Sequence, residues 1–140
     1  GRFAYVANQG SSTIAIFSIN TATGALTPAG SASTASSPYG IRIHPNGHYL
    51  YAAEEGNNQL AIYAINSSNG SLTSQGFATS PGFGPYDVAV TTTGDFLYLL
   101  DRLSSEVSAF SINSSTGSLT LLPGQPVSIG QGVLDIAITP

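Results

Sequence analysis

The chain is built from a repeated unit, and this feature constrains its fold more than any other. A nine-residue segment recurs three times, and its glycines, Gly24, Gly70 and Gly117, are 46 and 47 residues apart. Such a period is typical of repeat architectures, in which each unit buries its apolar face against its neighbours. The three copies read INTATGALT (19–27), INSSNGSLT (65–73) and INSSTGSLT (112–120).

The repeat extends well beyond this segment. Three more sets of segments align at the same spacing. Segments such as TIAIFSIN are rich in Ile, Val, Phe and Tyr, which favour β-strands, and are too short for helices. A residue present in all three copies is explained by the scaffold, whereas a residue found in one copy needs another explanation. The sets are FAYVAN (3–8), YLYAAE (49–54) and FLYLLD (96–101); TIAIFSIN (13–20), QLAIYAIN (59–66) and EVSAFSIN (106–113); and PYGIRIHP (38–45), PYDVAVTT (85–92) and VLDIAITP (133–140).

Each unit is predicted to form four short strands. Segments such as TIAIFSIN are apolar on both alternating faces, which indicates strands buried on both sides of a sheet. Asn-Gly and Thr-Gly pairs between the segments are typical of tight turns whose glycine supplies a positive φ. The predicted fold is therefore all-β, made of four-stranded antiparallel units of about 47 residues, which is the size of a β-propeller blade.

The chain is interpreted as one propeller segment of three repeats, 1–46, 47–93 and 94–140. Each repeat ends with the innermost strand (38–45 and its equivalents), so the last innermost strand lacks the strands that would follow it. Propellers usually close with four to eight blades, because closure removes exposed sheet edges. We therefore expect two chains to complete each other's terminal blades as a homodimer with six blades. The alternative is a piece, engineered or truncated, of a longer seven-bladed protein.

The charge composition excludes several classes of partner. Charged residues make up only 7% of the chain and the formal net charge is −4, so no basic surface is available for nucleic acid or anionic lipid. No apolar run reaches the length of a membrane-spanning helix. The absence of cysteine excludes disulfides and thiolate metal sites. Abundant Ser, Thr and Asn with no Lys is typical of an exported surface, and favours an extracellular or periplasmic location.

Charged and imidazole groups cluster between Tyr39 and Glu55, where Arg42, His44, His48 and Glu54 also lie. Comparison with the other two repeats shows that His48, Glu54 and Glu55 occupy positions that are polar in every copy. Arg42 differs, because the equivalent residues are alanines. A long cation at that position needs the central channel, a polar group of a neighbouring blade or a carboxylate, since a buried unpaired charge is costly.

A second set of polar residues is expected at one mouth of the channel. Asp87 and Asp135 begin the innermost strand of their repeats, and Tyr39 and Tyr86 follow the proline of theirs. These side chains could bind a ligand or a cation, or the aspartates could accept hydrogen bonds from loop amides. His44 and His48 flank a turn and make a poor metal pair. No nucleotide-binding or nucleophile motif occurs, and we expect neither a metal nor a cofactor.

Three motifs of this chain resemble blades of the lactonase-type, 6-phosphogluconolactonase-like seven-bladed β-propellers. They are F/Y-x-Y-x-A-N, I-N-x-x-T/N-G-x-L-T and P-x-G-I-x-I-x-P-N-G. The resemblance covers the whole chain and implies a lactone-hydrolysing activity. Lactonases of this family place an Arg-His pair after a proline, a later His in the same strand and a Glu after the next strand. Pro38 matches the proline, and His44 and Glu55 match the later His and the Glu. Tyr39 and Gly40 stand where the Arg-His pair would be.

Two hypotheses follow. Because the Arg-His pair of the lactonases is missing, we favour a non-catalytic scaffold or interaction module, whose three-blade chain self-assembles into a closed ring. The alternative is a lactone hydrolase with its site at the channel mouth, to which Arg42, His44 and Glu55 contribute.

Overall fold

The structure is a computed structural model that describes residues 1–139, and it confirms the all-β fold. Among these residues the only helical segments are two short 3-10 turns, Gln9–Ser11 and Glu55–Asn57, and no helix could span a membrane. The strands are β1 (Phe3–Asn8), β2 (Thr13–Ile19), β3 (Leu26–Ser33), β4 (Pro38–Ile43), β5 (Tyr49–Glu54), β6 (Gln59–Ile65), β7 (Leu72–Thr79), β8 (Pro85–Val90), β9 (Phe96–Asp101), β10 (Glu106–Ile112), β11 (Leu119–Leu121) and β12 (Val127–Ser128).

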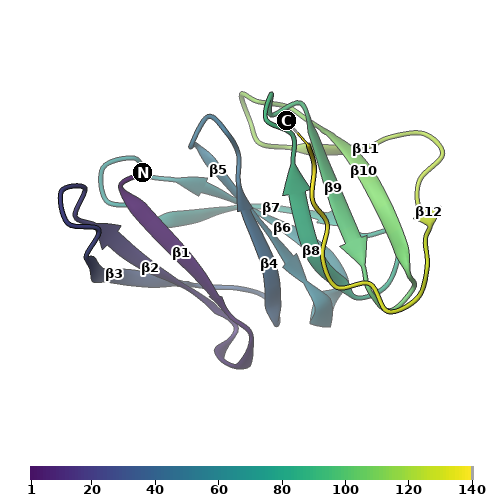
Figure 1. Cartoon of the computed structure of the whole chain (residues 1–140), viewed down its shortest axis with the longest axis horizontal. Coiled ribbons are helices and arrows are strands. Elements are labelled where there is room, and N and C mark those ends of the chain that lie inside the picture. Colours follow the sequence, from purple (N-terminus) through teal and green to yellow (C-terminus); the bar gives the residue numbers. More distant parts are fainter. Residues whose placement is uncertain (140) are drawn as a thin grey trace.

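The strands form three antiparallel sheets arranged side by side (Figure 1). The first has the order β1-β2-β3, the second β4-β5-β6-β7, and the third β8-β9-β10-β11 with β12 also paired to β10. Neighbouring sheets meet at their first strands, since β4 packs against both β1 and β8. The second and third sheets run from an inner strand to an outer one in chain order, and the first contains the equivalents of β5, β6 and β7. This is the arrangement of propeller blades.

The repeated I-N-x-x-x-G segment forms the turn before the outer strand of each sheet. In the second sheet the side-chain oxygen of Asn66 accepts a hydrogen bond from the Ser68 amide, and the Gly70 amide donates to the Asn66 carbonyl. Gly70 has a φ of +76°, a conformation that L side chains rarely adopt. Turn chemistry therefore explains why Asn and Gly recur in all three copies.

The contact between neighbouring sheets is also repeated. The Tyr5 hydroxyl donates to the Gly70 carbonyl at 2.8 Å, and the Tyr51 hydroxyl donates to the Gly117 carbonyl at 3.1 Å. The ring of the aromatic residue two positions earlier covers the same glycine, so that a Cβ at Gly117 would lie 2.5 Å from Tyr49. An aromatic pair on one sheet thus docks on the glycine turn of the next.

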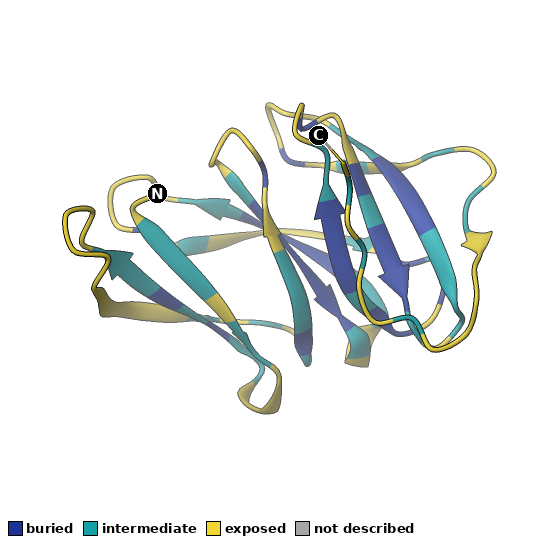
Figure 2. Cartoon of the chain, viewed as in Figure 1, coloured by how far each residue is buried: buried dark blue, intermediate teal, exposed yellow. Residues whose placement is uncertain are grey.

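The hydrophobic core lies mainly in and between the second and third sheets (Figure 2). Tyr51 and Leu60 of the second sheet pack with Leu97 and Phe110 of the third, and all four are buried. The first sheet is less well covered. Val6 is 45% exposed, whereas Leu99, at the equivalent position of the third sheet, is fully buried.

The strand predicted over residues 133–140 is wrong for residues 133–139, which lie outside regular secondary structure; Pro140 lies beyond the described residues. An inner strand pairs with the second strand of its own sheet, as β4 pairs with β5, and the sequence contains no fourth copy of that strand. The segment instead runs beside β8 (Figure 1), where the Ile136 amide donates to Asp87.

The outer strand of the third sheet also departs from the four-strand pattern. It is divided into β11 and β12, and Pro123 and Pro126 lie between the two pieces. Proline has no amide hydrogen, and so it cannot donate to the ladder of a continuous strand.

Candidate functional site

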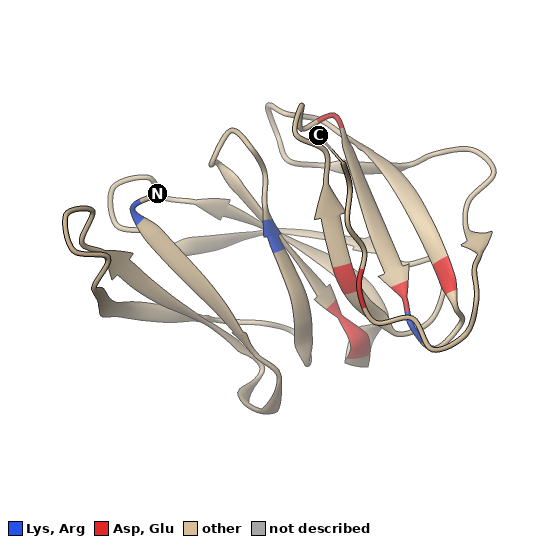
Figure 3. Ribbon diagram, viewed as in Figure 1, with Lys and Arg blue, Asp and Glu red and all other residues tan. Residues whose placement is uncertain are grey.

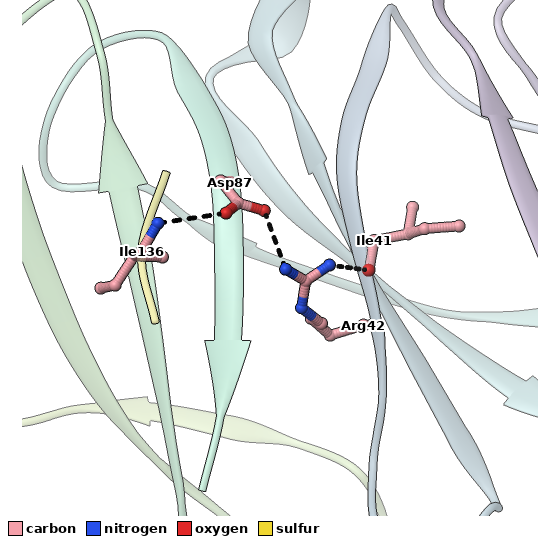
Figure 4. Close-up of polar contacts among 4 residues, drawn as sticks. All are labelled: Ile41, Arg42, Asp87 and Ile136. Carbon is pink, nitrogen blue, oxygen red and sulfur yellow. Dashed lines mark hydrogen bonds and ion pairs between the residues drawn. The ribbon is translucent and has the colours of Figure 1, made fainter. Parts of the chain in front are cut away.

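Arg42 of β4 and Asp87 of β8 lie opposite each other on the inner strands of neighbouring sheets (Figure 4). Figure 3 shows a basic position on β4 and an acidic one on β8. Arg42 Nη2 is 3.7 Å from Asp87 Oδ1, and Arg42 Nη1 donates to the Ile41 carbonyl at 3.0 Å. The second oxygen of Asp87, Oδ2, accepts the Ile136 amide at 3.3 Å. The Arg42 side chain is 47% exposed and that of Asp87 only 11%. Asp87 therefore anchors the arginine, while part of the guanidinium remains open to solvent.

This pair lies at a cavity of about 300 Å³ between β4, β8 and the segment after β12. All four residues expected at the channel mouth contribute to its lining, together with Arg42. The lining residues are Tyr39, Gly40, Arg42, Tyr86, Asp87, Leu134 and Asp135.

Gly40 makes the close approach of β4 and β8 possible. A Cβ built on Gly40 would lie 2.5 Å from Asp87 Oδ1 and 2.6 Å from the Asp87 Cα. The first inner strand therefore has glycine at the position where the other repeats have aspartate. The space that a side chain at Gly40 would occupy is filled by the carboxylate of Asp87, from the neighbouring sheet.

The Asp87 carboxyl has a raised pKa. Burial is the main cause, and a hydrogen bond with Asp135 raises the pKa of Asp87 further. The amides of Val88 and Ile136 and the charge of Arg42 oppose this shift. Two neighbouring carboxyl groups of this kind can hold and release a proton, which is the property that a general base requires.

Two tyrosine rings form the rim of the cavity. The centroids of Tyr39 and Tyr86 are 4.8 Å apart, and the guanidinium carbon of Arg102 lies 4.5 Å from the centroid of Tyr86. Arg102 also pairs with Glu55 at 3.3 Å. A hydrogen bond to Glu55 is the main cause of a raised pKa at Tyr39. Glu55 thus holds the rim and does not line the cavity.

The sequence comparison did not single out Arg102. One signal could have identified it, because Arg102 occupies the position of Glu55 in the next repeat. Opposite charges at equivalent positions of adjacent blades are brought together when those blades pack side by side.

His44 is separated from this cavity by its own contacts. Its ring is buried, with Nε2 2.9 Å from the Gly94 carbonyl and Nδ1 accepting the Asn46 amide at 3.1 Å. These partners define a neutral ring with the proton on Nε2, and they occupy both nitrogens. His44 joins the second sheet to the third, and the structure does not bring it together with Arg42 and Asp87.

The remaining residues of the charged cluster have structural surroundings. Glu54 is buried and accepts hydrogen bonds from the Ala35 amide, Gln59 and Tyr63, whereas His48 is exposed in a turn. Within residues 1–139 no group of three or more His, Asp or Glu side chains could hold a metal ion.

Three antiparallel sheets packed side by side, with a polar cavity between the inner strands of the second and third, define a β-propeller segment. Comparison with known families agrees with this class. The profile described as "Lactonase, 7-bladed beta-propeller" matches residues 1–134, and the chain belongs to this family.

Several solved structures are similar to this chain in fold and sequence. A provisionally assigned 6-phosphogluconolactonase from Bacteroides fragilis is 26% identical with a TM-score of 0.84, over 94% of this chain and 37% of that protein. One from Bacteroides uniformis is 28% identical with a TM-score of 0.83, over 92% of this chain and 38% of that protein. The Pseudomonas aeruginosa periplasmic gluconolactonase is 21% identical with a TM-score of 0.83, over 94% of this chain and 38% of that protein. This similarity shows the shared fold.

The chain therefore spans less than two fifths of the length of these relatives. A search of curated protein sequences found no match.

Proposed function

We propose that this chain supplies three blades and the channel-mouth site of a lactone-hydrolysing propeller. The observation that carries the proposal is the position of Arg42 beside the Asp87–Asp135 carboxyl pair in one cavity of about 300 Å³. Membership of the lactonase family supports it, as does the naming of similar structures as 6-phosphogluconolactonases. These findings favour hydrolysis over the non-catalytic scaffold that the sequence led us to prefer.

The reaction requires a base and a stabiliser of negative charge. The Asp87–Asp135 pair takes a proton from a water molecule, whose oxygen attacks the carbonyl carbon of the lactone. Arg42 donates hydrogen bonds to the carbonyl oxygen, which becomes negatively charged as the new C–O bond forms. The ring C–O bond then breaks, and the carboxyl pair returns the proton to the departing alkoxide. The net result is one lactone plus one water converted to one hydroxy acid.

The tyrosine rim suits a polyhydroxylated ring. Tyr39 and Tyr86 both line the cavity, and a tyrosine side chain combines an apolar ring, which suits the C–H groups of a sugar, with a polar hydroxyl. Arg102 and Glu55 hold this rim in place from outside the cavity. In this proposal Arg42 is the one member of the expected trio Arg42, His44 and Glu55 that touches the substrate.

A pH-stat assay tests the proposal with glucono-δ-lactone and 6-phosphogluconolactone as substrates. We expect ring opening above the spontaneous rate, lost in Arg42→Ala and in Asp87→Asn. Arg2→Ala and His48→Ala alter exposed groups away from the cavity and serve as controls. Circular dichroism verifies that each variant is folded. No acceleration by the unmodified chain, or full activity in both cavity variants, would overturn the proposal.

A further inference from the structure

A second cavity lies between the first and second sheets, away from the site at the channel mouth. Its volume is about 370 Å³, and it is formed where the end of β3 approaches β6 and β7. All of its lining residues belong to the first two sheets and their loops, and none of them lines the cavity that contains Arg42 and Asp87. Its walls include Ser33, Glu54, Gln59, Ala61, Tyr63 and Phe77.

Glu54 contributes a fully buried carboxylate to this cavity. Gln59 Nε2 donates to Glu54 Oε2 at 2.8 Å, while the Ala35 amide and the Tyr63 hydroxyl donate to Oε1 at 3.3 and 3.4 Å. All three partners are neutral donors. A buried carboxylate normally has a cation beside it as well, because the removal of a charge from water is costly.

The described part of the chain supplies no such cation. The sequence has no lysine, two of its three arginines form ion pairs with Asp87 and Glu55, and the third, Arg2, donates to a backbone carbonyl. One histidine is buried against the third sheet and the other is exposed in a turn. The charge of Glu54 is therefore not balanced by any side chain among residues 1–139.

The equivalent carboxylate of the third sheet has different surroundings. Asp101 accepts the Ser80 hydroxyl at 2.6 Å and the Ser108 hydroxyl at 3.5 Å. In the second sheet Ala61 stands at the position of Ser108. Thr34 stands at the position of Ser80, and its hydroxyl is buried with no hydrogen-bond partner within the described chain. Neither hydroxyl contact is made in the second sheet, where the carboxylate adjoins a cavity instead.

Two aromatic residues in the walls also distinguish this sheet. Tyr63 replaces a phenylalanine of the other two repeats, and its hydroxyl adds a polar group beside Glu54. Phe77 occupies the position of Ser31 in the first sheet, and its side chain is 61% exposed. Because Phe77 is paired with Ala61 across β6 and β7, both side chains lie on the cavity side of the sheet. Aromatic rings near an unbalanced carboxylate are the surroundings that attract organic cations.

We propose that this cavity binds a small organic ammonium ion. Glu54 accepts hydrogen bonds from the N–H groups of the cation and supplies the opposite charge, while the ring of Phe77 covers the apolar part of the molecule. The cavity volume is at the lower end of the range of about 300–1,000 Å³ that is typical of ligand sites, and therefore suits a compact amine. This site is separate from the channel mouth and from the hydrolysis proposed there.

Calorimetric and NMR titrations with n-pentylamine test this inference. The amine is protonated at neutral pH, whereas 1-pentanol has the same chain length without the charge and serves as the matched neutral probe. We expect saturable binding of the amine and no saturable binding of the alcohol. Absence of saturable amine binding, or equal binding of the alcohol, would overturn the inference.

Two variants locate the binding in this cavity. Glu54→Gln removes the charge with little change in size and should weaken amine binding about ten- to hundredfold. Phe77→Ser alters an exposed ring and should weaken it about two- to fivefold, a result that does not depend on whether Glu54→Gln folds.

Asp95→Asn and Phe83→Ser serve as matched controls, because they change an exposed carboxylate and a similarly exposed ring outside the cavity. Both should bind the amine as the unmodified chain does, and circular dichroism verifies that every variant is folded. Unchanged amine affinity in a folded cavity variant would overturn the inference, whatever the outcome of the lactone assays.

Discussion

The guanidinium of Arg42 and the carboxylate of Asp87 face each other across 3.7 Å, although they belong to different sheets. Nearly half of the Arg42 side chain is exposed, and ion pairs of that exposure contribute less than about 1 kcal/mol to stability. The positive charge of Arg42 also lowers the pKa of Asp87, as the smallest of the contributions, against burial and Asp135, which raise it.

Replacement of Arg42 should therefore separate stability from activity. Arg42→Ala is expected to lower the free energy of unfolding by less than about 1 kcal/mol and to raise the pKa of Asp87 further. Any residual hydrolysis should then require a higher pH than in the unmodified protein, because the base must lose its proton first. Urea unfolding and carbon-13 NMR titration of the carboxyl groups measure these effects, with Arg2→Ala as the control. An unchanged pKa at Asp87 would contradict this account.

Asp101 should make the protein more stable in mild acid. Burial raises its pKa to about 6 from an ordinary 3.8, despite hydrogen bonds from Ser80 and Ser108. Between these values the folded state binds more protons than the unfolded state, so stability falls as the pH rises from about 4 to 6 and levels off above 6. The expected loss is at most about 3 kcal/mol. Asp101→Asn should reduce this slope in urea unfolding, with the raised pKa of Asp87 responsible for part of what remains, while Asp95→Asn, in an exposed turn, should leave it unchanged. An undiminished slope in Asp101→Asn would count against this assignment.

The repeat was sufficient to predict an all-β propeller fold of antiparallel sheets from the sequence. Alignment of three copies identifies a strand wherever each copy is apolar at the same positions, and a turn wherever each copy has a glycine. The method fails where a strand depends on a partner that the sequence does not contain. Residues 133–139 look like β4 and β8 but have no second strand to pair with.

The site was predicted less completely, for a related reason. Asp87, Asp135, Tyr39 and Tyr86 were expected at one channel mouth, and they line one cavity with Arg42. His44 was expected in the site because it matches the later histidine of the lactonase motif, but its ring faces the turn of the next sheet. Whether a side chain reaches the cavity depends on the direction in which it points and on the backbone beside it. Neither can be predicted from the spacing of residues in a strand.

His44 should matter for stability rather than for chemistry. Its Nε2 links the second sheet to the third through the Gly94 carbonyl, its Nδ1 accepts the Asn46 amide of its own turn, and a Cβ on Gly94 would lie 2.6 Å from its ring. Removal of a buried, fully bonded ring leaves a cavity and unpaired polar groups, and His44→Ala is expected to cost about 2–4 kcal/mol. His48→Ala, at an exposed turn, should change stability by less than about 0.5 kcal/mol. Urea unfolding compares the two, and similar small effects would show that His44 does not join the sheets.

Tyr51 and Tyr98 provide the sharpest comparison, because they are equivalent residues with different surroundings. The Tyr51 hydroxyl donates to the buried Gly117 carbonyl, whereas the Tyr98 hydroxyl makes no hydrogen bond within the described chain. Tyr51→Phe should therefore lower the free energy of unfolding by about 1–2 kcal/mol.

Tyr98→Phe should change the free energy of unfolding by less than about 0.5 kcal/mol, because no partner for its hydroxyl lies within the described chain. Urea unfolding of the two variants measures the difference, and circular dichroism verifies that each is folded. Equal destabilisation by both variants would mean that the Tyr98 hydroxyl already has a partner within its own chain, and the comparison with Tyr51 would then be wrong.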